Sequence, residues 1–189
     1  MTIGVLALQG AFEEHMRMLH RLGADAFEIR KRGDLDRAFD GLILPGGEST
    51  VIGSLLRELQ MMESLSEAVK NGLPVLGTCA GLILLAKEIE ASEESYLGTM
   101  DISVVRNGYG RQLGSSEKRA LFLGKEIEMR FIRAPYIKEA AATVSILATV
   151  DHKIVAAQQG NQLVTAFHPE LTDDFTVHRH FLDIIRKSR

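Results

Sequence analysis

Short apolar runs alternate with segments of helical spacing along the first half of the chain. Runs typical of strands cover residues 3–8, 26–29, 42–44 and 75–76, and segments of helical spacing cover residues 12–22, 51–69 and 82–88. This alternation is typical of βαβ units, which build a parallel sheet. Because ligands gather at the carboxyl ends of parallel strands, we expect the chemistry of the protein in the turns that follow these runs.

From about residue 99 onward, strand-like runs follow one another without helical segments between them. They cover residues 102–105, 120–122, 127–131, 145–149, 154–157 and 163–167. We expect these runs to extend the same sheet as antiparallel strands. Residues 174–187 return to helical spacing, with Phe175, His178 and Phe181 on one face. Together the patterns predict one α/β domain over residues 1–189, with a mainly parallel central sheet between two layers of helices.

Composition narrows the class of protein. Of the 189 residues, 46% are hydrophobic and 25% are charged, and the formal net charge is −3, so neither a nucleic-acid partner nor a membrane partner is indicated. No apolar run approaches the roughly 20 residues of a membrane-spanning helix. The chain has one cysteine, and its first ten residues lack the features of a signal peptide, so we expect a reducing, cytoplasmic setting.

The sole cysteine lies in the segment "GTCAG", residues 77–81, between a strand-like run and a helix-like run. A nucleophile with a glycine two residues away on each side is typical of a nucleophile elbow, a sharp turn that presents the side chain above the sheet. A helix that starts at Ala80 would favour the Cys79 thiolate and offer backbone N–H groups to an oxyanion. The alternative is a small buried cysteine without chemistry, and the flanking glycines favour the nucleophile.

A cysteine nucleophile needs a histidine base that a third group orients. Of six histidines, only His168 directly follows an apolar run, in "TAFHPEL". Glu170 follows two residues later, and Pro169 restricts the backbone between them, so a hydrogen bond that fixes the imidazole tautomer is feasible. The alternative is an ordinary His-Pro-Glu turn at the surface. One cysteine and scattered histidines offer no cluster of metal ligands, and no motif indicates a cofactor.

The segment "LPGGEST", residues 44–50, ends another strand-like run and opens a helical one. Its glycines allow the backbone to approach a ligand, and a phosphate at the helix N-terminus is one interpretation, although the P-loop lysine is absent. In the second interpretation the Gly47 N–H points across to the elbow and forms an oxyanion hole together with the N–H of Ala80.

These three motifs together resemble those of the class I, or triad, glutamine amidotransferases. Within that class, six segments in order are similar to the glutaminase subunits of pyridoxal 5'-phosphate synthases. They are "LALQGAFEEH" (6–15), "PGGEST" (45–50), "GTCAGLILLA" (77–86), "RNGYGRQ" (106–112), "FIRAP" (131–135) and "TAFHPELTDD" (165–174). The resemblance covers nearly the whole chain and implies the flavodoxin-like fold of that class.

The resemblance also implies an activity, the hydrolysis of L-glutamine to glutamate and ammonia, and a partner, a (β/α)8-barrel synthase subunit in a large hetero-oligomer that takes up the ammonia. It implies that Cys79 forms a glutamyl thioester, that His168 transfers the protons and that Glu170 holds the imidazole. The glutamine pocket that it implies comprises Gly47, Glu48, Ser49, Arg106, Ile132 and Arg133. The arginines suit the α-carboxylate of glutamine, which needs a cationic partner.

Three positions depart from the family's pattern. Gln158 and Thr176 stand where arginines are expected, and His180 stands where a tyrosine is expected. These departures concern the partner-facing surface and the cap of the last helix, and none removes a group of the triad. Glu13 and His15 are assigned to an exposed face of the first helix, turned to the solvent or to the partner.

Three other functions compete with this interpretation. The same chemistry in the glutaminase of imidazole glycerol phosphate synthase is disfavoured by "RNGYGRQ" and "FIRAP". A cysteine hydrolase of the DJ-1-like group usually has its histidine directly after the cysteine, where this chain has Ala80. A catalytically silent regulatory module is disfavoured because Cys79, His168 and Glu170 are all present.

Overall fold

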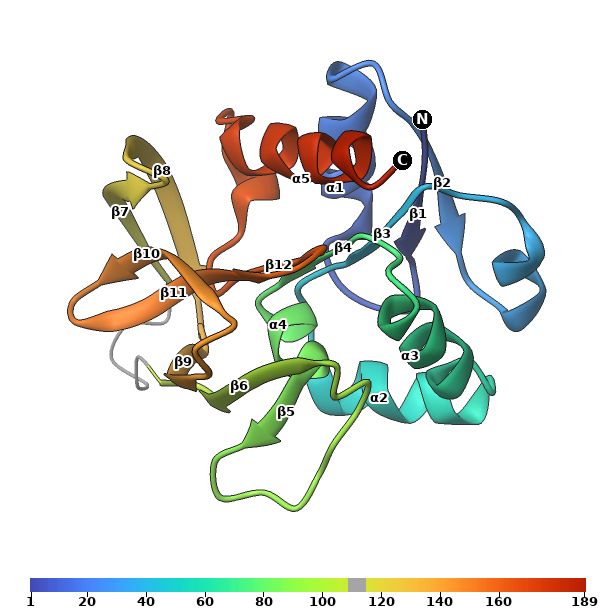
Figure 1. Cartoon of the computed structure of the whole chain (residues 1–189), viewed down its shortest axis with the longest axis horizontal. Coiled ribbons are helices and arrows are strands. Elements are labelled where there is room, and N and C mark those ends of the chain that lie inside the picture. The colour runs from blue at the N-terminus through green and yellow to red at the C-terminus, as the bar shows by residue number, and fades with distance from the viewer. Residues whose placement is uncertain (109–114) are drawn as a thin grey trace.

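Two groups of helices enclose a central sheet (Figure 1). The computed structural model of the chain describes residues 1–108 and 115–189. Two helices cover one face of the sheet, α1 (Phe12–Arg21) and α5 (Thr176–Lys187). The helices on the other face are α2 (Ser49–Glu58), α3 (Met62–Lys70) and α4 (Ala80–Leu85). The short turns η1 (Arg32–Asp36) and η2 (Pro169–Leu171) are 3₁₀ helices. This three-layer arrangement confirms the predicted fold class.

One half of the sheet is parallel. In spatial order its strands are β2 (Asp25–Ile29), β1 (Thr2–Leu6), β3 (Gly41–Leu44), β4 (Val75–Thr78) and β12 (Gln162–Thr165). β3 and β4 are buried along their whole length, which is why they read as continuous apolar runs. The prediction of an antiparallel strand at residues 163–167 is confirmed on one side and wrong on the other, because β12 pairs with β11 antiparallel but with β4 in parallel. This pairing buries Leu163 and Val164 in the middle of the sheet.

The other half of the sheet is mostly antiparallel, which confirms the predicted extension. It comprises β11 (Lys153–Gln159), β9 (Tyr136–Ala140), β6 (Met100–Val105) and β5 (Ala86–Ile89), with β10 (Ser145–Val150) paired to β11. The pattern of apolar residues did not predict β9, because Lys138 and Glu139 interrupt it.

Residues 120–122 and 127–131 form a separate hairpin rather than strands of the main sheet, so this part of the prediction was wrong. Within the described chain, β7 (Ser115–Phe122) and β8 (Lys125–Ile132) make a two-stranded sheet of their own. Buried and less buried residues alternate along β8, which gives the hairpin one face to pack against the domain. On that face the rings of Phe131 and Phe167 meet edge to face, with centroids 5.8 Å apart.

Two segments predicted as continuous helices are interrupted. The first, residues 51–69, breaks between α2 and α3, where Gln60 adopts a φ of 55° and Met61 is fully buried at the bend. The second, residues 82–88, ends as helix at Leu85 and continues at once as β5. A short buried apolar run does not distinguish helix from strand by periodicity, which explains the second error.

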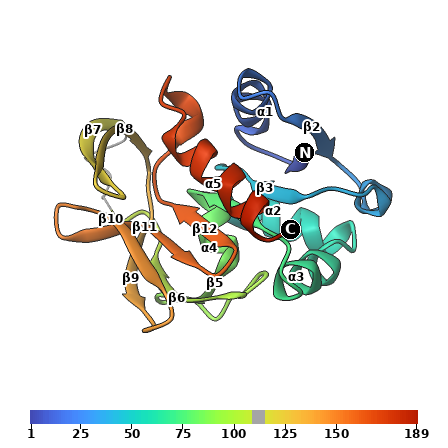
Figure 2. The same cartoon turned by 45° about the horizontal axis from the view of Figure 1, so that its top comes forward.

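The terminal helix packs as its spacing predicts. Phe181 and Ile185 of α5 are fully buried and lie so close to β3 that a Cβ on Gly41 would come within 2.5 Å of the Ile185 side chain. In Figure 2, α5 lies in front of the sheet. None of the helices in the described part of the chain is long and apolar enough to cross a membrane.

We predict that the buried side chains of the parallel strands contribute strongly to the stability of the fold. Leu42→Ala removes a fully buried side chain of β3 and should lower the free energy of unfolding by about 2–5 kcal/mol, through lost burial and the cavity left behind. The matched control is Leu121→Ala in β7, whose side chain is 59% exposed and should change it by no more than about 0.5 kcal/mol. Urea unfolding followed by far-UV circular dichroism measures both, since the chain has no tryptophan. Equal losses in the two variants would contradict the prediction.

Candidate active site

The candidate site lies where neighbouring parallel strands end. β4 and β12 are adjacent and in register, with Thr78 opposite Thr165, and the Cys79 N–H donates to the Thr165 carbonyl at 2.8 Å. The residues after these two strands therefore emerge at the same edge of the sheet. Cys79 follows β4 directly, and His168 follows β12 by three residues. The parallel pairing thus brings together two residues that are far apart in the chain.

Cys79 occupies a strained elbow, as predicted. Its φ and ψ are 49° and −97°, a conformation that side-chain-bearing residues rarely adopt, and α4 begins at Ala80. The flanking glycines are needed because the backbone is crowded: a Cβ on Gly81 would lie 2.1 Å from the Leu44 carbonyl oxygen. A Cβ on Gly77 would lie 2.7 Å from the backbone of Gly81. Strain of this kind costs on the order of 1–3 kcal/mol and persists only where the surroundings enforce it.

His168 and Glu170 are joined by a short hydrogen bond. The His168 Nδ1 lies 2.6 Å from the Glu170 Oε1, and both residues are buried. The His168 N–H also donates to the Arg130 carbonyl at 2.8 Å, which anchors the turn to β8. Burial opposes the charged imidazolium, but interactions with Cys79 and Glu170 outweigh it and raise the pKa of His168 to about 10. The residues predicted to form a triad are therefore brought together.

A second loop holds the His168 ring from the side of β3. The ring packs directly on Gly46, where a Cβ would lie 2.2 Å from the His168 Cε1. The loop after β1 in turn fixes this loop, because the Ala11 N–H donates to the Gly46 carbonyl at 3.0 Å and the Glu48 N–H donates to the Gln9 Oε1 at 2.8 Å. Neither Gln9 nor Gly46 was predicted to have a role, although both lie within the motif segments.

One residue assigned to the substrate pocket contacts the elbow cysteine directly. The Ile132 carbonyl oxygen lies 3.9 Å from the Cys79 Sγ. Its neighbour Arg133 is exposed and has a φ of 44°, so the end of β8 turns sharply beside the thiol. Gly47 and Glu48 are exposed after β3, whereas Ser49 is buried at the start of α2.

Arg106 is engaged with a different carboxylate. Its Nη2 lies 2.8 Å from the Glu94 Oε2 and 2.9 Å from the Tyr96 hydroxyl, and its buried Nε has no hydrogen-bond partner among the described residues. The ring of Tyr96 lies against Gly53 of α2, so Arg106 sits beside the helix that Ser49 begins. The rest of the motif "RNGYGRQ", from residue 109 on, lies outside the described residues.

His15 corrects the expectation of an exposed helix face. It is fully buried, with its Nδ1 2.9 Å from the His178 Nε2 and its Nε2 3.4 Å from the Glu170 Oε2. The reason is the packing of α1 against η2 and α5, which closes over this side of the helix. Glu13, on the other side, is exposed as expected.

The departures from the family's pattern lie apart from the triad, and two of them contact each other. The His180 Nε2 lies 2.8 Å from the Gln158 Oε1, and the Thr176 hydroxyl accepts a hydrogen bond from Lys125 at 2.8 Å. The substituted residues at positions 158 and 180 thus bind the last helix to β11.

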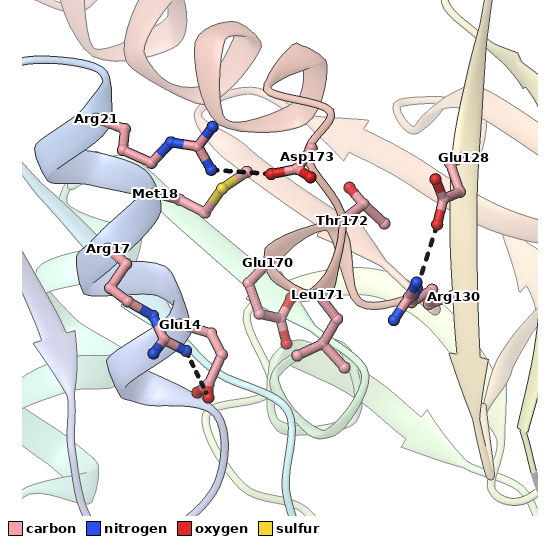
Figure 3. Close-up of a pocket in the computed structure, with 10 residues that line it drawn as sticks. All are labelled: Glu14, Arg17, Met18, Arg21, Glu128, Arg130, Glu170, Leu171, Thr172 and Asp173. Atoms are coloured by element: carbon pink, nitrogen blue, oxygen red, sulfur yellow. Dashed lines mark hydrogen bonds and ion pairs between the residues drawn. The ribbon is translucent and has the colours of Figure 1, made fainter.

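A pocket of about 420 Å³ lies next to Glu170, between α1, β8 and η2 (Figure 3). Its lining residues are Glu14, Arg17, Met18, Arg21, Glu128, Arg130, Glu170, Leu171, Thr172 and Asp173. Ion pairs such as Arg21–Asp173 occupy its walls, and the Glu170 side chain is inaccessible from it. The pocket is therefore not an entrance to the triad. Residues 1–108 and 115–189 contain no group of three or more metal-ligating side chains.

Comparisons with known proteins agree with this geometry. The sequence model of the SNO glutamine amidotransferase family matches residues 5–187. The pyridoxal 5'-phosphate synthase subunit PdxT of Haemophilus influenzae strain PittEE is 56% identical over 98% of this chain and 99% of its own length. PdxT of Methanocorpusculum labreanum is 59% identical over 98% of both chains. A crystal structure described as a glutamine amidotransferase superposes with a TM-score of 0.92, at 44% identity, over 97% of this chain and 98% of that one.

We predict that Gly46→Ala displaces the His168 imidazole, because the new Cβ would lie only 2.2 Å from its Cε1. The pKa of His168, raised to about 10 by its contacts with Cys79 and Glu170 against the effect of burial, should then fall toward its ordinary value near 6.5. Histidine ring NMR over a pH series measures this. Gly33→Ala is the matched control, since a Cβ there would meet nothing within 4 Å. An unchanged His168 titration in Gly46→Ala would contradict the prediction.

We also predict that buried His178 makes the protein sensitive to acid. Burial, assisted by His15, lowers the pKa of His178 from 6.5 to about 3, so the unfolded chain binds one more proton than the folded chain between these pH values. The stability that the neutral His178 contributes to the fold is fully present above pH 6.5. As the pH falls toward 3, the free energy of unfolding decreases by up to about 1.4 kcal/mol per pH unit. Urea unfolding from pH 7 to 4 should show a shallower loss in His178→Met than in the natural chain. Parallel pH dependences would refute this.

Proposed function

The chain belongs to the SNO glutamine amidotransferase family, and on that premise we propose that it is the glutaminase subunit of a pyridoxal 5'-phosphate synthase. The observation that supports this most strongly is the Cys79 elbow beside the bonded pair His168–Glu170, at the carboxyl ends of two adjacent parallel strands. The high identity to PdxT subunits over nearly their full length favours this synthase over other users of ammonia. We treat residues 1–189 as one glutamine amidotransferase domain.

In this proposal Cys79 is the nucleophile. Its thiolate attacks the side-chain amide carbon of L-glutamine and forms a tetrahedral oxyanion. His168, charged on its ring, protonates the nitrogen, ammonia leaves, and a glutamyl thioester remains. His168 then removes a proton from water, which attacks the thioester and releases glutamate and the Cys79 thiolate. Glu170 holds the His168 Nδ1–H throughout and stabilises the imidazolium, which their 2.6 Å contact supports.

The oxyanion hole and the glutamine pocket complete the proposed site. The N–H of Ala80, at the first residue of α4, and the N–H of Gly47 are assigned to the oxyanion. Gly47, Glu48, Ser49, Ile132 and Arg133 line the pocket in this assignment, which the contact of the Ile132 carbonyl with the Cys79 Sγ supports.

Arg106, together with Arg133, is a candidate partner of the α-carboxylate of glutamine. Its guanidinium already holds the carboxylate of Glu94. This pairing supports a carboxylate-binding role for Arg106, in which Glu94 and the substrate would share or exchange the cation. Glu94 was not predicted, because it lies in an acidic stretch, residues 88–95, that is typical of a solvated loop.

The ammonia goes to a synthase partner in this proposal, a (β/α)8-barrel subunit within a hetero-oligomer in the cytoplasm. A free glutaminase would waste glutamine, so we expect low turnover until the partner binds and completes the oxyanion hole through the backbone of residues 45–47. Glycines make such a backbone change sterically inexpensive.

We predict that glutamate release from L-glutamine rises when this chain is mixed with the barrel subunit of a pyridoxal 5'-phosphate synthase. Cys79→Ala should reduce the turnover of the mixture by roughly 10³-fold or more, because no other side chain can form the thioester. Coupled glutamate dehydrogenase detection measures release by the chain alone, by the mixture and by the variant.

A second mixture, with the barrel subunit of imidazole glycerol phosphate synthase, serves as the control for the choice of partner and should give no rise. A rise with that barrel instead would assign the chain to another synthase. No turnover in either mixture would refute the glutaminase, and equal turnover with and without the barrel would refute activation by the partner.

A further inference from the structure

A buried row of polar side chains continues behind Glu170. One oxygen of this carboxylate, Oε1, is bonded to His168, and the other, Oε2, is buried without a hydrogen-bond partner among the described residues. The Nε2 of His15 faces that second oxygen at 3.4 Å and also lies 3.2 Å from the Thr78 hydroxyl. The opposite ring nitrogen of His15 contacts the Nε2 of His178 at 2.9 Å. The proposed reaction gives no task to either histidine.

The chemistry of the carboxylate determines where the protons lie on these rings. An ionised Glu170 only accepts, so a proton on the His15 nitrogen 3.4 Å away is favoured over a lone pair there. In a neutral ring the His15 Nδ1 is then an acceptor and receives the N–H of the His178 Nε2. The Nδ1 of His178 is left without a proton, and this is the buried atom that has no partner within the described chain.

The reverse arrangement has two faults. It would direct the His15 lone pair at the Glu170 carboxylate, and it would leave a buried N–H of His178 without an acceptor, which is the more costly kind of unpaired atom. The N–H of His178 therefore points to His15, and the N–H of His15 points to the Thr78 hydroxyl, with the Glu170 carboxylate 3.4 Å from the same nitrogen.

The charges of the surrounding groups agree with neutral rings. Burial lowers the pKa of His15, an effect that Glu170 opposes and that the nearby His168 reinforces, with a weaker opposing contribution from Glu14. Burial with the help of His15 lowers the pKa of His178 to about 3. For Glu170 burial alone would raise the pKa, but His15 and His168 outweigh it and lower the pKa.

Resting on the proposed function, we propose that His15 is a positioning residue of the triad. Its Nε2–H, oriented by His178, faces the second oxygen of Glu170 and keeps that carboxylate ionised and in place. Glu170 in turn holds the Nδ1–H of His168, which leaves the other ring nitrogen available for proton transfer near Cys79. Thr78, beside Cys79 in the chain, shares the same N–H of His15 and ties the row to β4.

Two substitutions of His15 by side chains of similar length distinguish this positioning role from a role in packing alone. His15→Gln keeps an N–H donor near the position of Nε2, whereas His15→Met has none, and both residues are good helix formers. In the complex with the barrel subunit we expect His15→Met to lower kcat about 10- to 100-fold, a fraction of what general acid–base catalysis contributes, with KM for L-glutamine unchanged. The acidic limb of the pH–rate profile of His15→Met should move to higher pH, because the Glu170 carboxylate loses a hydrogen-bond donor. His15→Gln should restore both kcat and the position of the acidic limb. Equal rates and pH profiles for the two variants would overturn the proposal.

If neither His15 variant folds, the same pair of substitutions at His178, the next residue of the row, tests the proposal. His178→Gln keeps the donor to His15 and should retain the pH profile, whereas His178→Met should move its acidic limb in the same direction as His15→Met. Coincident profiles for this pair would overturn the proposal.

Ring ¹⁵N NMR of the natural chain tests the proton positions without any turnover. We expect His15 and His178 both to carry the proton on Nε2, and a proton on the His15 Nδ1 alone would overturn the proposal. The natural complex could release glutamate, and Cys79→Ala could abolish that release, while the two His15 variants behave alike. That result would reject the role of His15 and would still support the glutaminase. A natural complex without turnover would reject both.

Discussion

The candidate site depends on the parallel pairing of β4 with β12. Their register sets Thr78 opposite Thr165, so Cys79 and His168 leave the same edge of the sheet. A slip of one residue would shift one strand by roughly 3.3 Å and turn its buried side chains to the other face. Because both strands are buried on either side, such a slip would be strongly opposed. The hydrophobic core thus holds the relative position of the two groups that the proposed chemistry needs.

Close backbone packing then holds the loops at this edge. Three loops, after β1, β3 and β4, approach one another at distances that leave no space for a side chain at Gly10, Gly46 or Gly81. The Gly46 carbonyl lies only 1.9 Å from where a Cβ on Gly10 would be, and the φ of Gly10 is +103°. This crowding supplies the surroundings that sustain the strained conformation of Cys79. The same crowding fixes the position of the His168 ring. The placement of His168 and the strain at Cys79 therefore have the same cause.

Polar groups in the core make the site rigid in a second way. His15, Thr78, Glu170 and His178 are buried, and each unpaired donor or acceptor among them would cost about 1–3 kcal/mol. Their contacts with one another link α1, β4, η2 and α5 through a single row. A side chain in such a row cannot rotate without leaving a neighbour unpaired, which keeps the Glu170 carboxylate aimed at His168. Stability and the orientation of the triad are therefore coupled.

The sequence by itself determined the features that depend on local spacing. The glycines around Cys79, the strand before His168 and the two-residue step to Glu170 predicted the elbow, the base and its partner, because each rests on neighbours in the chain. The alternation of apolar runs predicted the layers of the fold for the same reason. It misassigned the helix over residues 82–88 and missed the parallel pairing of β12 with β4, because short buried runs look alike in helix, parallel strand and antiparallel strand.

Only the tertiary structure decided which distant residues meet. His15 and His178 are 163 residues apart, and on periodicity alone His15 belongs as well to an exposed helix face as to a buried one. The pairing of Arg106 with Glu94, the support of His168 by Gly46 and the clamp of Gln9 on Glu48 likewise follow from how loops and helices pack. Burial and hydrogen-bond partners are properties of these long-range contacts. Sequence spacing therefore located the reactive groups, and packing determined what holds them.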